Sequence, residues 1–348
     1  MQSDHTVAII GAGPIGIELA IALKKNGISF IQFDKGQAGQ SIYDFPLQTH
    51  FFSTSEKIAI ADNPIQVADQ QKCTREEYLA YLRCCILEHN LQINTFEKVA
   101  SVRSCQTRGK FILETVYGDE KRSYQTTFVV FATGGTAFSR KLGIPGENLS
   151  HVSSKLMEPH LYFQKQIAIV GSRNSAVEWA LRAFHAGAKV TLISRREIFD
   201  TEHVKYWLLP ELKNLVREEY IRCIFSTQVI EISANKLKLL NINGEVSEIH
   251  ADFVVKAIGF LADMSLLDYV GVTIAADNIP LFNPETMETD IANSFVIGTA
   301  TGGTQLKYKI FIENSHEHVN KVVEMIGARL GKVIKMQKKI NLGMIPEQ

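Results

Sequence analysis

The sequence predicts an α/β protein built from two parallel-sheet domains of the same plan. At 348 residues the chain exceeds the size at which a single hydrophobic core usually stops growing. Residues 8–35 also align without a gap on residues 168–195, and each copy has the pattern of a strand, a glycine turn, an amphipathic helix and a second strand. The same folding unit is therefore expected twice.

The first copy, AIIGAGPIGIELAIALKKNGISFIQFDK, has the glycine spacing of a phosphate-binding turn. Gly11 allows the tight turn after the strand, Gly13 lets a pyrophosphate approach the backbone, and Gly16 lets the helix pack closely on the sheet. The helix that opens near Pro14 offers free N–H groups and the positive end of its dipole. Asp34 ends the next strand, where a carboxylate can accept both hydroxyl protons of a ribose. The pattern predicts a Rossmann-like dinucleotide site.

The second copy differs at positions that change its ligand. Arg173 replaces the middle glycine and Ala176 the last, which the pattern tolerates because only close packing is needed there. Ser194 stands where the first copy has an aspartate, and Arg195 and Arg196 follow it. A carboxylate would repel a 2′-phosphate, whereas these three residues can donate hydrogen bonds to one. The sequence therefore favours NADPH over NADH at this site; the alternative is a solvated run of surface arginines.

Two dinucleotides in one chain are most simply explained by hydride transfer between a nicotinamide and a flavin. The segments VVFATGG at 129–135 and VVKAIGF at 254–260 are expected as the strands that close the two sheets. The order of these features predicts an FAD-binding domain formed by residues 1–146 and 263–348, with an NADPH-binding domain, residues 147–262, inserted into it. The expected cofactors are therefore FAD and NADPH.

Further elements are expected around the two repeats. Short strands at 97–103, 110–116 and 121–126 predict a small antiparallel layer, and residues 76–89 have the pattern of a helix. Near the C-terminus, residues 293–305 form a strand that enters a glycine-rich turn, followed by a helix expected at about 310–326. In a flavoprotein this turn and helix could lie beside the isoalloxazine ring; the alternative is a tight turn in the core.

Composition argues against several other classes of protein. Lys plus Arg and Asp plus Glu number 37 each, so no overall field favours nucleic acid or an anionic membrane surface. The apolar runs are too short to cross a bilayer and the N-terminus lacks a signal-like pattern, so a cytoplasmic protein is expected. The five cysteines form no CxxC pair and no zinc-like spacing, which predicts reduced thiols and no metal site.

Several motifs resemble the YpdA family of bacillithiol disulfide reductases, and the similarity runs over nearly the whole chain. The motifs are GAGPIG, SIYDFP (41–46), FFSTSEK (51–57), GSRNSAVEWAL, YWLLPEL (206–212), NPETMETD (283–290) and IFIEN (310–314). The resemblance implies reduction of bacillithiol disulfide or its partner redoxin by NADPH through FAD, a role in thiol redox homeostasis, and a homodimer. The related thioredoxin reductase-like flavoproteins share the two-domain plan but carry a CxxC pair.

The glycine patterns and the resemblance together assign residues to both cofactors. Those assigned to FAD are Gly11, Gly13, Pro14, Gly16, Asp34, Lys35, Ser41, Phe52, Val99, Thr133, Gly134, Gly298 and Thr299. Those assigned to NADPH are Gly171, Ser172, Arg173, Asn174, Ser175, Ala176, Ser194, Arg195, Arg196 and Gly259. By resemblance, the backbone of Val99 would meet adenine, and Thr299 stands where the wider superfamily usually has Asp.

One position departs from the YpdA pattern. Members of that family carry a cysteine directly after the proline of the first glycine motif, and this chain has Ile15. A cysteine at a helix N-terminus would have a lowered pKa and could attack a disulfide, which isoleucine cannot do. The chain is therefore expected either to pass hydride directly from the flavin to its acceptor or to serve a different acceptor.

Three functions fit these patterns. The leading prediction is an FAD-dependent NADPH oxidoreductase acting on a small disulfide, a redoxin-like protein or another two-electron acceptor. A single-component flavin monooxygenase has the same two glycine motifs and usually a histidine-containing stretch before the second; GENLSHVSSK at 146–155 places His151 there without the full pattern. A non-catalytic sensor that binds NADPH and FAD is the third, favoured only by Ile15 and Thr299.

Overall fold

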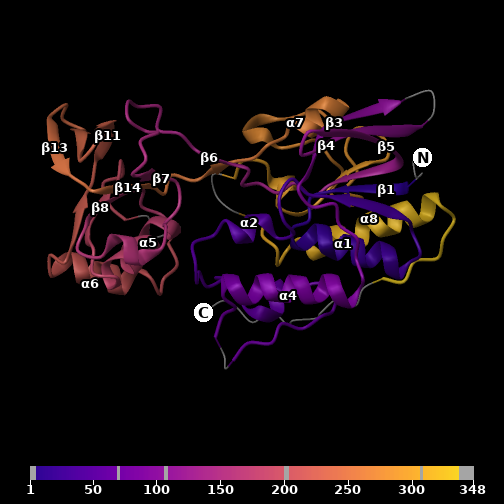
Figure 1. Ribbon diagram of the computed structural model, residues 1–348, viewed down its shortest axis with the longest axis horizontal. Coiled ribbons are helices and arrows are strands. Elements are labelled where there is room, and N and C mark those ends of the chain that lie inside the picture. The colour runs from indigo at the N-terminus through magenta and orange to yellow at the C-terminus, as the bar shows by residue number, and fades with distance from the viewer. Residues whose placement is uncertain (1–4, 69–70, 106–108, 200–203, 306–308, 337–348) are drawn as a thin grey trace. The chain divides into compact units, whose positions relative to one another are not determined.

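The computed structural model describes residues 5–68, 71–105, 109–199, 204–305 and 309–336, and the chain divides into two compact units. Unit 1 consists of Met1–Phe138 and Phe260–Gln348, and unit 2 of Ser139–Gly259 (Figure 1). The sequence pattern predicted the two domain boundaries after residues 146 and 262, whereas the units divide after residues 138 and 259. The short strands β6 (Phe138–Ser139) and β15 (Phe260–Leu261), which pair with each other, lie where the chain passes from one unit to the other.

Both copies of the repeat form the expected strand–helix–strand unit, so the predicted α/β class is confirmed. In unit 1 it is β1 (His5–Ile10), α1 (Pro14–Lys25) and β2 (Phe30–Phe33); in unit 2 it is β8 (Gln166–Val170), α5 (Asn174–His185) and β9 (Lys189–Ile193). Each helix ends just before a glycine in the left-handed region, Gly27 at φ +62° and Gly187 at φ +85°. Glycine adopts this conformation without steric cost, which ends the helix.

Unit 1 is built on a six-stranded sheet in the order β2-β1-β5-β4-β3, with β16 also paired with β5. The pairs β1 with β2, β1 with β5 and β16 with β5 are parallel, whereas β3, β4 and β5 form antiparallel pairs. The remaining strands are β3 (Glu97–Cys105), β4 (Lys110–Tyr117), β5 (Glu120–Phe131) and β16 (Ser294–Val296). The strands expected at 97–103 and 110–116 are thus confirmed.

Strand β5 joins two strands that the sequence predicted separately. Its first half, from residue 120 to 126, pairs with β4, and its second half, from residue 126 to 131, pairs with β1. The first half is mostly exposed and the second buried, which is why the composition changes along one strand. Because no turn residue stands between the halves, the strand continues from the antiparallel layer into the parallel sheet.

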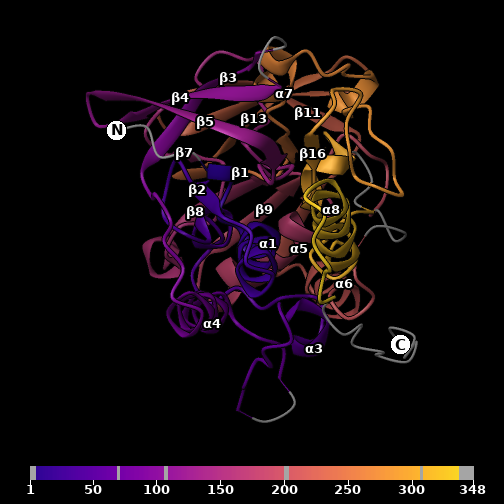
Figure 2. The ribbon, with the colours of Figure 1, turned by 90° about the vertical axis from the view of Figure 1, so that its right-hand side faces the viewer.

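The helices of unit 1 pack on this sheet and on each other. Besides α1 they are α2 (Gln40–Tyr43), α3 (Ser55–Ile58), α4 (Arg75–Glu88), α7 (Ser265–Val270) and α8 (His316–Arg329), with short 3₁₀ turns η2 (Ala276–Asn278) and η3 (Gly298–Gly302). Helices α1 and α8 lie side by side (Figure 2), and Ile21 and Val322 are fully buried in their shared core. No helix in the described part of the chain is both long and apolar enough to cross a membrane.

Helix α8 begins at His316, later than the residue 310 expected from the sequence. The preceding residues are held in turns by side chains that bind the backbone. Gln305 accepts from the N–H groups of Lys309 and Ile310 at 2.8 and 2.9 Å, and Asn314 accepts from Phe311 N at 2.8 Å. Such local hydrogen bonds compete with the helical ones, so the helix starts only after them.

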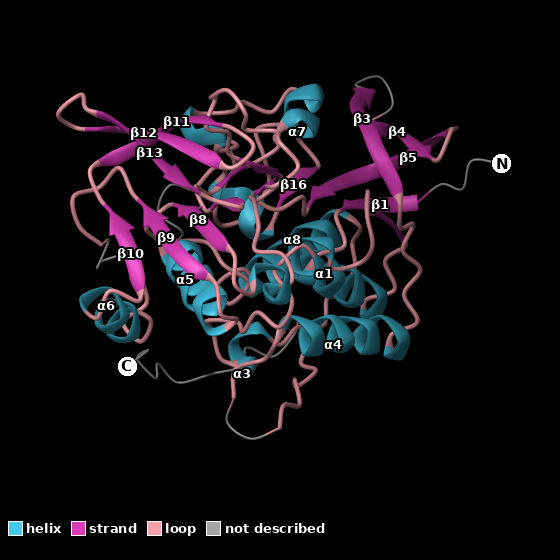
Figure 3. Cartoon of the chain, turned by 60° about the vertical axis from the view of Figure 1, so that its left-hand side comes forward, coloured by secondary structure: helices cyan, strands magenta, loops and turns pink. Residues whose placement is uncertain are grey.

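Unit 2 contains a five-stranded parallel sheet in the order β10-β9-β8-β14-β7 and a three-stranded antiparallel sheet, β11-β12-β13 (Figure 3). The elements are β7 (Val152–Ser153), β10 (Ile221–Ile224), β11 (Thr227–Ile232), β12 (Lys236–Asn241), β13 (Val246–His250), β14 (Phe253–Lys256), α6 (Leu209–Arg217) and the 3₁₀ turn η1 (Pro159–Tyr162). Helix α5 packs on β8 and β9, where Val177 and Ile169 are fully buried.

A buried ion pair joins the two ends of unit 2. Lys256 Nζ lies 2.6 Å from Glu147 Oε1, and the two side chains are 8% and 6% exposed. Glu147 also accepts from the N–H groups of Leu142 and Gly143 at 2.8 and 2.7 Å. Burial opposes ionisation of Glu147, but the hydrogen bonds and the Lys256 charge outweigh it and lower its pKa to about 2. The pair therefore fixes the segment that enters unit 2 against the strand that leaves it.

Replacing Glu147 by Gln should leave the Lys256 ammonium buried without a counter-charge. Breaking such a pair costs about 3–5 kcal/mol, so the free energy of unfolding of unit 2 should fall by that order at pH 7. Both tryptophans, Trp179 and Trp207, belong to unit 2, so their fluorescence during urea unfolding measures this change. Glu248→Gln, which removes an exposed partner of Lys236, is the control and should cost less than about 1 kcal/mol.

The same variant should also change how stability depends on pH. Because the pKa of Glu147 is lower in the folded protein than its ordinary value of 4.5, the stabilisation is fully present above pH 4.5 and is lost as pH falls toward 2. The difference between the wild type and Glu147→Gln should therefore shrink across this interval. A difference that stayed constant from pH 7 to pH 2 would contradict the assignment.

Candidate functional site

The glycine turn of unit 1 is tightly packed at two positions and open at a third. Gly11 has φ +111°, and a Cβ there would lie 2.3 Å from the carbonyl oxygen of Ala132. A Cβ on Gly16 would lie 2.3 Å from Gly11 O, whereas a Cβ on Gly13 would meet no atom within 4 Å. Helix α1 starts at Pro14 without a side-chain cap. The turn thus leaves open space beside unpaired N–H groups, which fits a phosphate.

Asp34 follows β2 and binds two residues of neighbouring turns. Its Oδ2 accepts from Ala12 N at 2.7 Å and its Oδ1 from Gly36 N at 2.8 Å. Burial raises the pKa of Asp34, and the two N–H groups partly oppose the rise. Because each carboxylate oxygen has a second acceptor position, ribose hydroxyls can still be bound. Lys35 is exposed, with Nζ 5.9 Å from the centroid of the Phe138 ring.

Four predicted residues come together where β5 and β16 end. These neighbouring parallel strands lead into Thr133–Gly134 and Gly298–Thr299. Thr299 Oγ1 accepts from Gly135 N at 3.2 Å, and a Cβ on Gly134 would lie 3.7 Å from the same oxygen. The buried Thr133 Oγ1 has no hydrogen-bond partner among the described residues. A buried hydroxyl normally has a partner, so this edge of the sheet fits a ligand with a polar group.

Ser41 and Phe52 are the two ends of segment 41–52, which follows closely on a contact with the glycine turn of unit 1. Gly39, just before α2, donates from its N–H to Ala12 O at 2.8 Å. Ser41 is exposed on α2, and the Phe52 carbonyl accepts a hydrogen bond from Lys72 Nζ. The first end of the segment is thus tied to the turn that carries Gly11 and Gly13.

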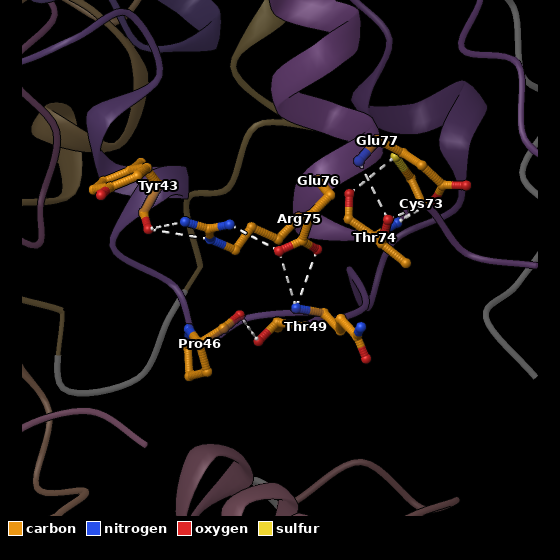
Figure 4. A network of polar contacts seen from close by, with 9 residues as sticks. Tyr43, Pro46, Thr49, Cys73, Thr74, Arg75, Glu76 and Glu77 are labelled. Atoms are coloured by element: carbon orange, nitrogen blue, oxygen red, sulfur yellow. Dashed lines mark hydrogen bonds and ion pairs between the residues drawn. The ribbon is translucent and has the colours of Figure 1, made fainter. Parts of the chain in front are cut away.

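The start of α4 holds the middle of this segment in place (Figure 4). The buried Arg75 donates from Nη2 and Nε to Tyr43 O at 2.7 and 3.1 Å, and its guanidinium lies 5.0 Å from the Tyr43 ring centroid. Glu76 accepts from Gln48 N at 3.0 and 3.1 Å. Thr74 caps the helix and is bonded reciprocally to Glu77. The segment is therefore fixed by charge-assisted hydrogen bonds to one helix end.

Val99 lies in the same sheet as the other residues assigned to FAD. It is buried in β3 and pairs with Thr115 of β4, and the register shifts between Val99 and Ser101. The first residue of β3, Glu97, donates from its N–H to Asp34 O at 3.0 Å. The start of β3 thus lies against the end of β2, where Asp34 stands.

Sequence reasoning did not find two histidines that contact this region. His316 Nδ1 lies 2.8 Å from Glu18 Oε2 and its Nε2 lies 2.9 Å from Lys57 O, so both ring nitrogens face acceptors and the imidazolium satisfies both. Burial lowers the pKa of His316, but Glu18 outweighs burial and the net shift is upward. His318 Nδ1 accepts from Gly298 N at 3.1 Å, and burial lowers its pKa to about 4. The upward shift favours the imidazolium form of His316, and the downward shift favours the neutral form of His318.

The only sequence signal for this contact is Glu18, which aligns with Glu178 in the second copy of the repeat. His316 is 298 positions from Glu18, so no local periodicity reveals the pair. A carboxylate on the buried face of α1 requires a partner, and that partner is known only from the fold.

The glycine turn of unit 2 repeats the tight position of unit 1. Gly171 has φ +141°, and a Cβ there would lie 2.4 Å from Ala257 O. Ala176 is buried where the first copy has Gly16, and Ser172 is also buried. Helix α5 starts at Asn174 with Arg173 as N-cap and no side-chain cap; Ser175 is exposed in its first turn. The first N–H groups of this helix again have no partner within the helix.

Ser194 holds the turn after β9 in the way that Asp34 holds the turn after β2. Its buried Oγ accepts from Arg196 N at 3.0 Å, a bond two residues along the chain like that from Asp34 to Gly36. The side chains of Arg195 and Arg196 are exposed. Gly259, at φ +92°, follows the end of β14, and a Cβ there would lie 3.8 Å from the Arg140 side chain.

A family model described as pyridine nucleotide-disulphide oxidoreductase matches residues 8–298, a range that includes both glycine turns. The chain belongs to this family. Among its relatives, bacilliredoxin reductase Bdr of Bacillus subtilis (strain 168) is 35% identical over 322 residues, which are 92% of this chain and 97% of the relative.

Two solved structures are also similar to this oxidoreductase. The bacillithiol disulfide reductase Bdr (YpdA) from Bacillus cereus has a TM-score of 0.89 and 34% identity, covering 94% of this chain and 100% of that one. The protein of the same description from Staphylococcus aureus has a TM-score of 0.87 and 33% identity, covering 94% of this chain and 99% of that one. The resemblance to the YpdA family is confirmed. The chain is an NADPH-dependent flavin oxidoreductase that uses FAD and NADPH.

The five cysteines of this oxidoreductase all lie among the described residues and form no disulfide, and Ile15 occupies the start of α1. Ile15 is 6% exposed, and its Cβ lies 3.4 Å from the position of a Cβ on Gly298. Burial raises the pKa of Cys73 and of Cys223 to about 12, and it also raises the pKa of Cys85. These three thiols therefore stay protonated at neutral pH and are poor nucleophiles.

Alanine at Gly13 should impair cofactor binding without disturbing the fold. A Cβ there meets no protein atom, and the backbone at φ −73° and ψ 178° suits any residue. The methyl group would instead occupy the space assigned to the pyrophosphate, so the affinity for FAD should fall by about tenfold or more. Quenching of flavin fluorescence on titration of the apoprotein measures this affinity.

Gly16→Ala is the matched control, because its Cβ would lie 2.3 Å from Gly11 O. It should lower the stability of the apoprotein by about 1–3 kcal/mol, whereas Gly13→Ala should leave the apoprotein melting temperature unchanged. Full FAD affinity in Gly13→Ala would show that the space beside Gly13 does not receive the cofactor.

Proposed function

We propose that this oxidoreductase transfers two electrons from NADPH through FAD to a small disulfide or a redoxin-like protein. Overall, NADPH and one proton reduce one S–S bond to two thiols, and NADP⁺ is released. The bound FAD supplies the two-electron chemistry that links the nicotinamide to the acceptor. The observation that carries the proposal is the contrast between Asp34 in unit 1 and Ser194-Arg195-Arg196 at the same place in unit 2.

Unit 1 is proposed as the FAD-binding unit. The space beside Gly13 and the uncapped start of α1 suit a pyrophosphate, and Asp34 keeps acceptor positions for ribose hydroxyls. Thr133 Oγ1 lacks a partner among the described residues, and a polar group of the cofactor would supply one. Thr299 already accepts from Gly135 N, so its hydroxyl hydrogen can be donated to the cofactor.

Unit 2 is proposed as the NADPH-binding unit. Ser194 Oγ accepts from Arg196 N, so its hydroxyl hydrogen is directed to another acceptor, and a 2′-phosphate is such an acceptor. The exposed guanidinium groups of Arg195 and Arg196 can reach the same phosphate. Aspartate in this position would repel it, which is why unit 1 is not proposed to bind NADPH.

The acceptor is proposed from the relatives and from the thiols of this chain. The relatives are described as reductases of bacilliredoxin or of bacillithiol disulfide. Ile15 stands where, by resemblance to the YpdA family, a cysteine could attack a disulfide, and Cys73, Cys85 and Cys223 have raised pKa values. We therefore propose reduction without a thiol of this chain. A cytoplasmic location and a homodimer complete the proposal, and five cysteines without a disulfide suit a reducing compartment.

Anaerobic mixing of the holoenzyme with NADPH and bacillithiol disulfide should yield two thiols for each NADPH consumed. A variant in which all cysteines are replaced (Cys73→Ala, Cys84→Ser, Cys85→Ala, Cys105→Ser and Cys223→Ala) should keep this ratio, with a rate within about twofold of the wild type. Reduction of a quinone by the same variant serves as the control for an intact flavin site.

Two results would contradict the proposal. If the variant still reduced the quinone but not the disulfide, a thiol of the chain would take part. If the wild type left every disulfide and redoxin intact and consumed NADPH only with oxygen, the acceptor assignment would be wrong and a monooxygenase would be favoured.

A further inference from the structure

The segment 204–208 is anchored at the first residue of α5. Lys205 N donates to Asn174 Oδ1 at 2.8 Å. Val204, which precedes it, is 4% exposed and belongs to the same buried cluster as Ala176 and Trp179 of α5. One bond and one buried side chain therefore place the backbone of Lys205 beside the helix N-terminus.

The bond to Lys205 also sets the orientation of the Asn174 amide. Because Oδ1 accepts from the Lys205 N–H, the other end of the amide, Nδ2, is the end that can donate elsewhere. Nδ2 carries two N–H groups, and Asn174 is the first residue of α5. A donor pair is thus fixed at a helix end whose first backbone N–H groups have no partner within the helix.

Two cationic residues belong to this helix end and to the segment bonded to it, Arg173 and Lys205. The N-cap is Arg173, and the first turn of α5 contains no acidic residue. The first carboxylate along the helix, Glu178, lies 3.9 Å from Arg182, and burial raises its pKa to about 7. The helix dipole and the Lys205 ammonium add to the same field. Such an end is stabilised by a bound anion.

An aromatic pair lies beside the Lys205 ammonium. Its Nζ is 5.4 Å from the centroid of the Trp207 ring, and the Tyr206 and Trp207 rings meet at 86° with their centroids 5.1 Å apart. Tyr206 is 62% exposed. A cation over an aromatic face keeps its charge while its position is restricted, so the ammonium stays near the segment that touches Asn174.

We propose that Lys205 and Asn174 Nδ2 bind the pyrophosphate of NADPH. The inference rests on the assignment of unit 2 to NADPH made above. It divides recognition between two sets of residues. Arg195 and Arg196, after β9, bind the 2′-phosphate, whereas Asn174 at the start of α5 and Lys205, whose N–H is bonded to Asn174, bind the pyrophosphate common to NADPH and NADH. The first set gives the preference for NADPH, and the second adds affinity without preference.

Calorimetry on the oxidised holoenzyme can distinguish the two sets of residues by measuring the affinity for two probes. NADP⁺ contains both phosphate groups, whereas adenosine 2′-monophosphate contains only the 2′-phosphate. Lys205→Met, which keeps most of the apolar stem, should weaken NADP⁺ about tenfold and leave the monophosphate unchanged. The double variant Arg195→Ala with Arg196→Ala should weaken both probes.

Two further variants serve as controls for charge and for position. Lys205→Arg should keep NADP⁺ affinity within about threefold of the wild type, because the positive charge is retained. Lys213→Ala removes an exposed lysine of α6 in the same unit and should change neither probe. An unchanged melting temperature of Lys205→Met excludes loss of fold as the cause.

If Lys205→Met lost affinity for both probes equally, the proposal would be overturned. The lysine would then act on the 2′-phosphate or through a general electrostatic field. Unchanged NADP⁺ affinity would also overturn it, while leaving the assignment of unit 2 intact. Failure of the wild type to bind NADP⁺ at all would overturn that assignment and this inference together.

Discussion

The uncapped N-termini of α1 and α5 are the feature that both proposed cofactor sites require. In both units a glycine sits where a side chain would collide with a carbonyl of the neighbouring strand end: 2.3 Å from Ala132 O for Gly11 and 2.4 Å from Ala257 O for Gly171. The chain can turn from strand to helix only without a Cβ at this point. The result is a helix end whose first N–H groups have no partner within the helix, which suits a phosphate.

The two units share this frame and differ in the turn after the second strand of the repeat. Asp34 and Ser194 occupy the same place and each accepts from the N–H two residues ahead, so the turn is kept while the charge changes. In unit 1 the carboxylate favours ribose hydroxyls; in unit 2 the hydroxyl and Arg195 and Arg196 favour a phosphate. A change of charge at one turn, without a change of fold, therefore separates the proposed FAD and NADPH units.

Local patterns predicted the repeat, the strands β3 and β4 and the α/β class, because glycine turns and alternating apolar residues depend on near neighbours. They missed features that depend on the fold. Strand β5 continues across two layers because β4 and β1 pair with its two halves. The contacts of His316 with Glu18 and of Lys205 with Asn174 join residues 298 and 31 positions apart, so neither has a local signature. The assignment of the turn glycines to cofactors stays a prediction.

One chain is proposed to hold two dinucleotides at separate sites, FAD in unit 1 and NADPH in unit 2. Titration of the FAD-loaded protein with NADP⁺ tests directly whether both dinucleotides bind at once. Free and bound FAD differ in fluorescence, so any release of FAD is detected during the titration. We expect saturation at one NADP⁺ per chain while one FAD per chain stays bound. Release of FAD in proportion to bound NADP⁺ would show a single shared site and contradict separate binding, as would a protein that stays colourless after incubation with FAD.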